Sequence, residues 1–256
     1  MASSSLHPPS PARPGLLLGV GVGPGDPQLL TLQALSALRE ADRVVAPTTA
    51  PDSEGRAESV VRQALPDLAV DRIPFSMTSD DTPEGAAARA DSHQGAADRL
   101  VGWLDAGETV AFVTLGDPNV YSTFPSVAAT LLDRRPGTRV ETLPGICAFQ
   151  ALASATGTVL LDGTETLALV TALDGTAPVK EALSDPSRAV VVYKGGRHLP
   201  EIAALLADQD RLEGAVVGEL LGLPGQTLRP VAEAAGEPAS YLATVIVPPA
   251  PRRLQP

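Results

Sequence analysis

Short, continuous apolar runs alternate along this chain with longer segments whose apolar residues recur at helical spacing. Residues 16–22 (LLLGVGV) form the first such run. The segment after it places leucine at every third position, at Leu29, Leu32, Leu35 and Leu38. Strands that helices bury on both faces have this continuous apolar character. The alternation therefore predicts an α/β protein with a mostly parallel sheet covered by helices.

The same alternation locates the individual elements. Strands are expected at residues 16–22, 43–46, 69–73, 109–115, 139–143, 167–173, 189–193, 215–220 and 242–247. Helices are expected at residues 27–41, 54–65 and 84–106, in a segment ending at 132, and at 147–156, 179–183 and 199–207. Asp26 stands at the N-cap position of the first helix and Pro27 at its first residue, where a missing N–H costs nothing. The pattern restarts after Ile146, which predicts a domain boundary near residues 143–146.

Composition limits the kinds of partner. The 256 residues carry 19 Lys and Arg against 30 Asp and Glu, a formal net charge of −11, so the chain repels a phosphate backbone. Phe, Tyr and Trp number only 4, 3 and 1, which leaves few platforms on which bases stack. Nucleic acid is therefore not expected as a partner. A membrane is not expected either, because no apolar run approaches the roughly 20 residues of a spanning helix.

The cysteine content and the first residues bear on the cellular compartment. Cys147 is the only cysteine, so no internal disulfide can form. Residues 1–14 (MASSSLHPPSPARP) are rich in Ser and Pro, which predicts a disordered tail. They also lack the basic start and the apolar core of an export signal. A cytoplasmic location is expected.

The most informative segment is GVGVGPGDPQLLTL, residues 19–32. Its glycines stand at alternate positions, Gly19, Gly21, Gly23 and Gly25, and let the backbone approach a ligand or a neighbouring strand closely. A dinucleotide-binding G-x-G-x-x-G is absent, because Pro24 and Asp26 occupy the positions where its last glycine would stand, and no phosphate-binding G-x-x-x-x-G-K-[ST] occurs. Taken alone, the segment fits a tight strand-to-helix turn without a ligand equally well.

A second segment, TLGDPNVYST at residues 114–123, follows a predicted buried strand. It places Gly116, Asp117, Tyr121 and Ser122 just past the carboxyl end of that strand, where open α/β sheets bind ligands. The alternative is purely structural, with Asp117 capping the following helix ahead of Pro118.

The third segment, LPGICAFQA at residues 143–151, is a sharp turn that opens a helix of small residues. Cys147 invites a nucleophile interpretation, but a lone cysteine is more often a small buried hydrophobe. The histidines, His7, His93 and His198, lie far apart and have no metal-binding motif around them, so no metal site is expected. A serine hydrolase is not expected either, because G-x-S-x-G is missing.

Together, in this order and at these separations, the three segments resemble the tetrapyrrole methylases over residues 15–247. LLTL after the first turn, GDPxxYST at residues 116–123 and FSM at residues 75–77 are most similar to the precorrin-2 C20-methyltransferase branch of that family. The resemblance implies two αβα domains, residues 15–143 and 144–250, with a cleft between them. It also implies a homodimer.

The resemblance further implies S-adenosylmethionine as methyl donor and a tetrapyrrole as acceptor. The residues implied to bind the donor are Pro24, Gly116, Asp117, Val120, Tyr121, Ser122, Cys147, Ala148, Lys194 and Ala243. The acceptor carries several carboxylates, for which Lys194, Arg197 and His198 are the candidate cations on the turn that follows a strand. Arg89, His93 and Arg99 are further candidates, and solvated surface charge is the alternative for each of the six residues.

The implied reaction is methylation of C20 of precorrin-2, which gives precorrin-3A and S-adenosylhomocysteine. The sulfonium of the donor is already a strong electrophile and C20 is an electron-rich carbon, so alignment supplies most of the rate, about 7–11 kcal/mol in well-oriented model reactions. Asp117 is the nearest carboxylate in the motifs, but it equally suits orienting the donor, and no residue is named as a catalytic base.

Three alternatives stay open at this level. The same reaction on cobalt-precorrin-2 differs only by the central ion, and no residue separates the two acceptors. A related methylase acting on another ring carbon, or on a protein side chain in diphthamide synthesis, is disfavoured by the Tyr121-Ser122-Thr123 ending. A non-catalytic sensor that binds the donor or a tetrapyrrole is disfavoured because it has no reason to keep strained glycine turns.

Overall fold

The computed structural model describes residues 14–50, 52–75 and 82–250, apart from the side chains of residues 83 and 89. The expected disordered tail therefore lies outside the described residues, except for Pro14. The chain forms two compact units: the first comprises Met1–Gly23 and Leu30–Gly145, and the second comprises Pro24–Leu29 and Ile146–Pro256. Within the described ranges, none of the helices combines the length and the apolar character that crossing a membrane requires.

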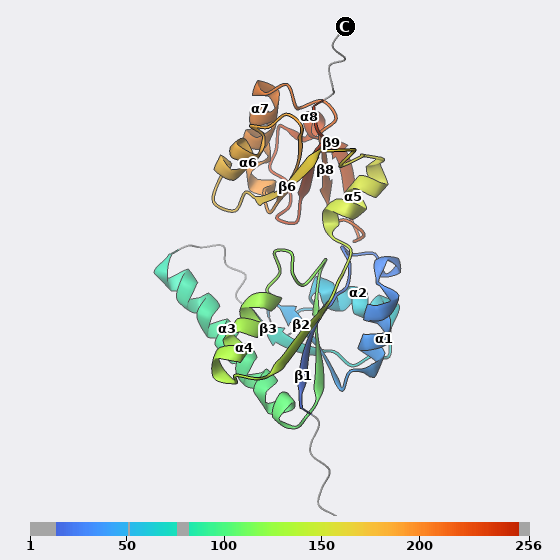
Figure 1. Cartoon of the computed structure of the whole chain (residues 1–256), viewed down its shortest axis with the longest axis vertical. Helices are drawn as coiled ribbons and strands as arrows, with labels where there is room; N and C mark the ends of the chain where they lie inside the picture. The colour runs from blue at the N-terminus through green and yellow to red at the C-terminus, as the bar shows by residue number, and fades with distance from the viewer. Residues whose placement is uncertain (1–13, 51, 76–81, 251–256) are drawn as a thin grey trace, which may run out of the picture. The chain divides into compact units, whose positions relative to one another are not determined.

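The first unit is built on a sheet with the strand order β3-β2-β4-β1-β5, in which every neighbouring pair is parallel (Figure 1). Its strands are β1 (Leu16–Gly21), β2 (Arg43–Thr48), β3 (Asp71–Pro74), β4 (Thr109–Thr114) and β5 (Arg139–Leu143). Its helices are α1 (Leu32–Glu40), α2 (Arg56–Ala64), α3 (Pro83–Asp105) and α4 (Phe124–Arg134). The predicted α/β class with a parallel sheet is confirmed for this unit.

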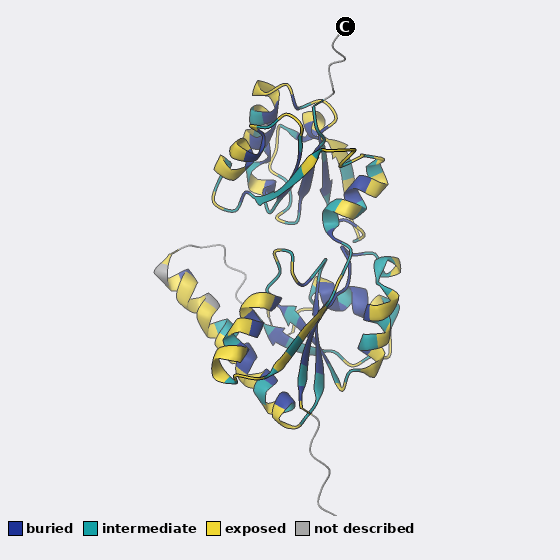
Figure 2. Ribbon diagram, in the orientation of Figure 1, coloured by how far each residue is buried: buried dark blue, intermediate teal, exposed yellow. Residues whose placement is uncertain are grey.

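Alternate residues of the central strands serve two separate cores. Leu17 and Phe112 pack with residues of α3 and α4, whereas Val20 and Val113 pack with residues of α1 and α2. Side chains of a strand point to opposite faces in turn, so a continuous apolar run supplies both layers. Figure 2 shows the result, with the central strands buried and the outer helix surfaces exposed. Gly19 lacks a side chain where one would clash, since an added Cβ would lie 2.6 Å from the Phe124 ring.

The second unit has the strand order β6-β7-β10-β8-β9. Its strands are β6 (Thr166–Thr171), β7 (Arg188–Tyr193), β8 (Val216–Glu219), β9 (Thr227–Pro230) and β10 (Thr244–Val247). Its helices are α5 (Ala148–Thr156), α6 (Ala177–Ala182), α7 (Leu199–Asp208), α8 (Val231–Ala234) and the 3₁₀ turn η2 (Gly196–His198). Only β6 and β7 are parallel, and the other three pairs are antiparallel. The expectation of a mostly parallel sheet is thus wrong for this unit.

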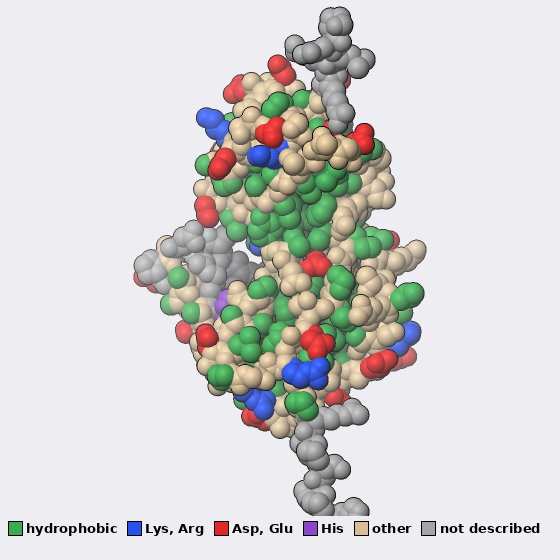
Figure 3. Space-filling view, in the orientation of Figure 1, with side chains coloured by type: hydrophobic (Ala, Val, Ile, Leu, Met, Phe, Trp, Pro, Cys, Tyr) green, Lys and Arg blue, Asp and Glu red, His purple; other side chains and the backbone are tan. Residues whose placement is uncertain are grey.

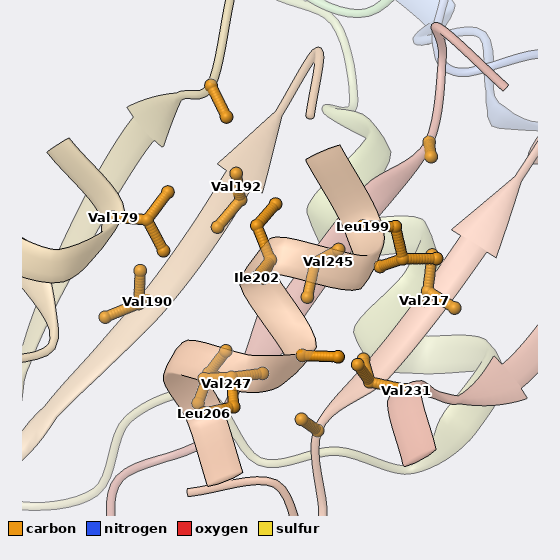
Figure 4. Packing of buried hydrophobic residues seen from close by; sticks show 14 of the residues in the cluster. Val179, Val190, Val192, Leu199, Ile202, Leu206, Val217, Val231, Val245 and Val247 are labelled. Carbon is orange, nitrogen blue, oxygen red and sulfur yellow. The ribbon is translucent and has the colours of Figure 1, made fainter. Parts of the chain in front are cut away.

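The larger core of the second unit lies beneath α6, α7 and α8. Val190, Val192 and Val245 contribute to it from the sheet, and Leu199 and Ile202 contribute from α7 (Figure 4). The opposite face of the sheet is covered by α5, where Leu152 packs with Val191 and Ile246. The unit therefore has helices on both sides of its sheet.

The predicted helix over residues 27–41 is interrupted. Residues Pro27–Leu29 form a short 3₁₀ turn, η1, and α1 begins only at Leu32. Asp26 caps the turn, because its Oδ1 accepts the N–H of Gln28 at 2.8 Å. Thr31 caps α1, because its Oγ1 accepts the N–H of Ala34 at 3.1 Å. The sequence pattern did not reveal the cap at Thr31, because the three-residue leucine spacing continues across the break between η1 and α1.

Candidate functional site

The turns that follow β1 and β4 are joined backbone to backbone. The N–H of Gly116 donates to the carbonyl oxygen of Gly23 at 2.7 Å, and the N–H of Gly23 donates to the oxygen of Gly116 at 3.4 Å. Both glycines have positive φ angles, +77° for Gly23 and +74° for Gly116, a conformation that favours glycine. The first two sequence motifs therefore form one structure at the carboxyl edge of the parallel sheet, where α/β proteins bind ligands.

The third motif enters the same place, because β5 lies next to β1. A Cβ added to Gly145 would lie 2.0 Å from the carbonyl oxygen of Gly116, and one added to Gly21 would lie 2.6 Å from that oxygen. Real Cβ atoms do not come so close, so both positions need glycine for packing alone. An added Cβ on Gly116 itself meets nothing within 4 Å. The space that a side chain at position 116 would occupy is thus open.

Asp117 uses both carboxylate oxygens to hold backbone in place. Oδ2 accepts the N–H of Gly145 at 2.9 Å, and Oδ1 accepts the N–H of Asn119 at 2.8 Å. The alternative of a helix cap is wrong, because α4 starts only at Phe124. Asp117 instead links the turn after β4 to the turn after β5.

The residues between Asp117 and α4 form a tight loop. The N–H of Val120 donates to the carbonyl oxygen of Asp117 at 3.2 Å. The Oγ of Ser122 donates to the carbonyl oxygen of Pro118 at 2.9 Å and accepts the N–H of Phe124 at 3.0 Å, so this hydroxyl fixes the start of α4. Tyr121 has a φ of +49° and its side chain is 45% exposed. The loop therefore presents the Tyr121 ring at the surface from a strained backbone.

Pro24 is buried and belongs to the second unit together with the rest of residues 24–29. Residues 24–29 pack closely against the turn after β8. A Cβ added to Gly25 would lie 2.3 Å from the carbonyl oxygen of Leu221, and a Cβ added to Gly222 would lie 2.3 Å from the backbone nitrogen of Asp26. The glycines of this motif thus serve two different neighbours, Gly21 and Gly23 in the first unit and Gly25 in the second.

Cys147 and Ala148 lie at the start of α5. Cys147 is buried and is the N-cap residue, and its N–H donates to the Oε1 of Gln150 at 2.9 Å. The Tyr193 hydroxyl at the end of β7 accepts the N–H of Phe149 at 3.1 Å. Sequence reasoning missed Gln150 and Tyr193. The spacing of Cys147 and Gln150, which matches that of a capping box, offered a signal for the first, but no local pattern offered one for Tyr193.

Lys194 and Ala243 flank a paired position at one end of the second sheet. Tyr193 of β7 pairs with Thr244 of β10 in antiparallel register, and Lys194 follows the first of these residues while Ala243 precedes the second. Ala243 is 2% exposed. Lys194 has a φ of +56°, and burial lowers the pKa of its ammonium group. The structure thus places both residues next to the same paired strand ends.

Arg197 and His198 lie in η2, just past Lys194. The Nε of Arg197 lies 3.1 Å from the Nε2 of His198, whose Nδ1 lies 3.3 Å from the Oε2 of Glu201. Arg197 also donates to the carbonyl oxygen of Leu173. These contacts hold an exposed guanidinium, with further N–H donors, on the loop that leaves β7.

The remaining candidate cations lie on α3. Arg99 donates to the carbonyl oxygen of Arg72 at 2.9 Å and lies over the Trp103 ring, 5.8 Å from its centre. His93 packs against Phe75, with their ring centres 5.8 Å apart. Both side chains therefore have structural contacts within the first unit. The side chain of Arg89 lies outside the described residues. Across residues 14–50, 52–75 and 82–250, no cluster of three or more His, Cys, Asp or Glu side chains suits a metal ion.

The chain is similar to known proteins in sequence and in fold. The family model described as Tetrapyrrole (Corrin/Porphyrin) Methylases matches residues 16–235. The precorrin-2 C(20)-methyltransferase of Sinorhizobium sp is 35% identical over 238 residues, which cover 91% of this chain and 95% of that protein. The cobalt-precorrin-2 C(20)-methyltransferase of Salmonella typhimurium is 31% identical over 238 residues, which cover 91% of this chain and 96% of that protein. A cobalamin synthesis related protein (CobF) from Corynebacterium diphtheriae has the same fold, with a TM-score of 0.67 at 20% identity and coverage of 92% of this chain and 98% of that one.

Proposed function

Since this chain belongs to the tetrapyrrole (corrin/porphyrin) methylases, we propose that it transfers the methyl group of S-adenosylmethionine to C20 of precorrin-2. The products are precorrin-3A and S-adenosylhomocysteine. The observation that carries the proposal is the 35% identity to a precorrin-2 C(20)-methyltransferase over nearly the full length of both chains. The Tyr121-Ser122-Thr123 ending of the second motif adds support from the sequence itself.

We propose that the donor is bound by the residues that the resemblance names. They are Pro24, Gly116, Asp117, Val120, Tyr121, Ser122, Cys147, Ala148, Lys194 and Ala243. Their chemistry suits the donor in two respects. The backbone at Gly116 borders open space, so a ligand can approach it without a side chain in the way. Ala148, which is partly buried at the start of α5, has a small apolar side chain that takes up little space beside a ligand.

The chemistry needs alignment more than it needs an acid or a base. The donor supplies an electrophilic methyl group on its sulfonium. The task of the protein is to hold the donor and the acceptor carbon in line, which in favourable cases contributes about 7–11 kcal/mol. Asp117 is already engaged by two backbone N–H groups, so its proposed contribution to donor binding is through the loop that it holds. No residue is proposed as a catalytic base.

The acceptor carries carboxylates, and this chain has a net charge of −11, so local cations must bind them. We propose that Lys194, Arg197 and His198 do so, because they stand together at the carboxyl end of β7. A second candidate acceptor is cobalt-precorrin-2. It is favoured by the 31% identity to a cobalt-precorrin-2 C(20)-methyltransferase over nearly the full length of both chains.

Anaerobic incubation with methyl-labelled S-adenosylmethionine tests the proposed function. Precorrin-2 and its cobalt complex are supplied in parallel reactions, with a donor-free reaction as control, and the products are analysed by mass spectrometry and carbon NMR. Label at C20 in one acceptor and not in the other identifies the substrate. Label at another carbon contradicts methylation at C20 but remains consistent with a tetrapyrrole methylase. Absence of label in both acceptors, with measurable donor binding, overturns the methyltransferase proposal in favour of a sensor.

We also propose that the protein is a cytoplasmic homodimer. Cys147 is the single cysteine of the sequence, so no disulfide can form within the chain, which suits a reducing compartment. Hydrophobic side chains gather on the visible face of the second unit (Figure 3). In that unit Val159 is 68% exposed and Leu161 is 45% exposed, and such apolar surface often marks a protein interface. Light scattering after size exclusion should give the mass of two chains; the mass of one chain contradicts the dimer.

A further inference from the structure

The start of α5 is held by a side chain from a distant strand. The N–H of Phe149 lies in the first turn of α5, where backbone donors have no partner within the helix. It donates to the hydroxyl oxygen of Tyr193 at 3.1 Å. Tyr193 is the last residue of β7, 44 residues further along the chain. This hydrogen bond therefore adds a specific polar contact between two segments that also pack through Leu152 and Val191.

Tyr193 is itself held firmly at the end of the sheet. Its carbonyl oxygen accepts the N–H of Ala172 at 3.0 Å, and its backbone pairs with Thr244 of β10. Its side chain packs in the same apolar cluster as Ala148 and Phe149. The phenol thus extends from a fixed strand end to the first turn of the helix.

Both partners of this hydrogen bond stand beside residues that are proposed to bind the donor. Cys147 and Ala148 immediately precede Phe149, and Lys194 immediately follows Tyr193. The Tyr193 hydroxyl consequently fastens the first turn of α5 to the end of β7. Donor-binding groups must be held to within a fraction of an ångström, so a bond at this point affects binding without touching the ligand.

We propose that Tyr193 is a positioning residue for donor binding, whose hydroxyl holds Cys147 and Ala148 in place against the end of β7. The inference rests on the proposed function, because it takes these two residues as donor contacts. The Tyr193→Phe substitution removes the hydroxyl and keeps the ring in the apolar cluster. We expect it to raise the Kd for S-adenosylhomocysteine about three- to tenfold, the effect of one lost hydrogen bond.

The matched control is Thr156→Val at the other end of the same helix. Its hydroxyl donates to the carbonyl oxygen of Leu152 at 2.8 Å and lies 2.8 Å from the Oγ1 of Thr158, so the substitution removes the hydroxyl hydrogen bonds at the last turn of α5. It leaves the first turn intact. We expect Thr156→Val to lower the melting temperature while the Kd for S-adenosylhomocysteine stays at the wild-type value.

Calorimetric titration of the full chain with S-adenosylhomocysteine provides the measurement, for the wild type and both variants. Hydrogen exchange of the peptide that contains residues 147–152 should be faster in Tyr193→Phe. In turnover, the KM for the donor should rise while the KM for the tetrapyrrole stays unchanged. An unchanged Kd in Tyr193→Phe, or an equal rise in Thr156→Val, overturns the positioning role alone. Failure of the wild type to bind S-adenosylhomocysteine overturns the proposed function itself.

Discussion

The N–H of Gly145 donates a hydrogen bond of 2.9 Å to the Oδ2 of Asp117, across 28 residues of sequence. The bond ties the loop after β4 to the loop after β5. A charged acceptor makes such a bond stronger than one between neutral groups. It also gives the aspartate of the second motif a structural task that is independent of any ligand.

We expect Asp117→Asn to destabilise the donor-free protein. Asparagine keeps one acceptor oxygen but places an amide N–H₂ against one of the two backbone donors, so one bond is lost and the charge is removed. The free energy of unfolding should fall by about 1–3 kcal/mol, as measured by urea denaturation. Asp133→Asn on the exposed surface of α4 is the control. Equal stability of Asp117→Asn and this control is inconsistent with the structural task.

Gly145→Ala should disrupt the junction of the three motifs. The new Cβ would lie 2.0 Å from the carbonyl oxygen of Gly116, so one of the loops must move, at a cost of about 1–3 kcal/mol. Gly102→Ala in α3 adds the same methyl group where nothing lies within 4 Å, and it should raise stability by up to about 1 kcal/mol because alanine favours helix. Thermal unfolding of both variants checks the opposite signs. A neutral Gly145→Ala contradicts the close packing.

The environment of Glu58 predicts that the free energy of unfolding of the first unit falls at acid pH. Its side chain is fully buried on α2, and its oxygens accept from the Nε of Arg72 and the Nε of Arg62, each at 2.7 Å. Burial alone raises the pKa of the carboxyl, but the hydrogen bonds from Arg72 and then Arg62 outweigh it, so the pKa lies below its ordinary value.

The sign of the pH effect follows from that lowered pKa. An unfolded glutamate has a pKa of about 4.3, so the contribution of Glu58 is complete above that pH and is lost as the pH falls through the lower folded value. Glu58→Gln should therefore cost about 2–4 kcal/mol near pH 7, and its difference from the wild type should shrink below about pH 4. Urea midpoints across this pH range test the prediction, with Glu40→Gln on the exposed face of α1 as control. A difference that does not change with pH contradicts it.

Arg197→Ala should weaken binding of the acceptor and not of the donor. The guanidinium is exposed on the loop after β7 and is held by His198, so its free donors are available to a carboxylate. Loss of one charge-assisted bond should raise the KM for the tetrapyrrole about tenfold, with little change in the KM for the donor. Lys180→Ala, exposed on α6, provides a control of equal charge. An unchanged KM for the tetrapyrrole contradicts the proposal that Arg197 binds the acceptor.

Much of the local structure was predictable from the sequence. The strand at residues 139–143 was predicted with the bounds that it has, β4 ends one residue earlier than predicted, and α3 begins and ends one residue earlier than predicted. β4 is a buried run and α3 is a long helix, whereas β5 has no fully buried residue and is followed by the Pro144-Gly145 turn that marks its end in the sequence. β9 and α8 were missed because they are short and β9 is mostly exposed, so neither leaves an apolar pattern.

Local patterns in the sequence are enough to predict most of the strands and helices in their order, the glycine-rich turns and the family that they indicate. These are properties of neighbouring residues and of their spacing. Only the folded structure shows which strands pair and in which direction, that residues 24–29 join the second unit, and that Asp117 holds Gly145 while Tyr193 holds Phe149. Such contacts join residues far apart in the chain, and their geometry depends on how the layers pack, which no local pattern records.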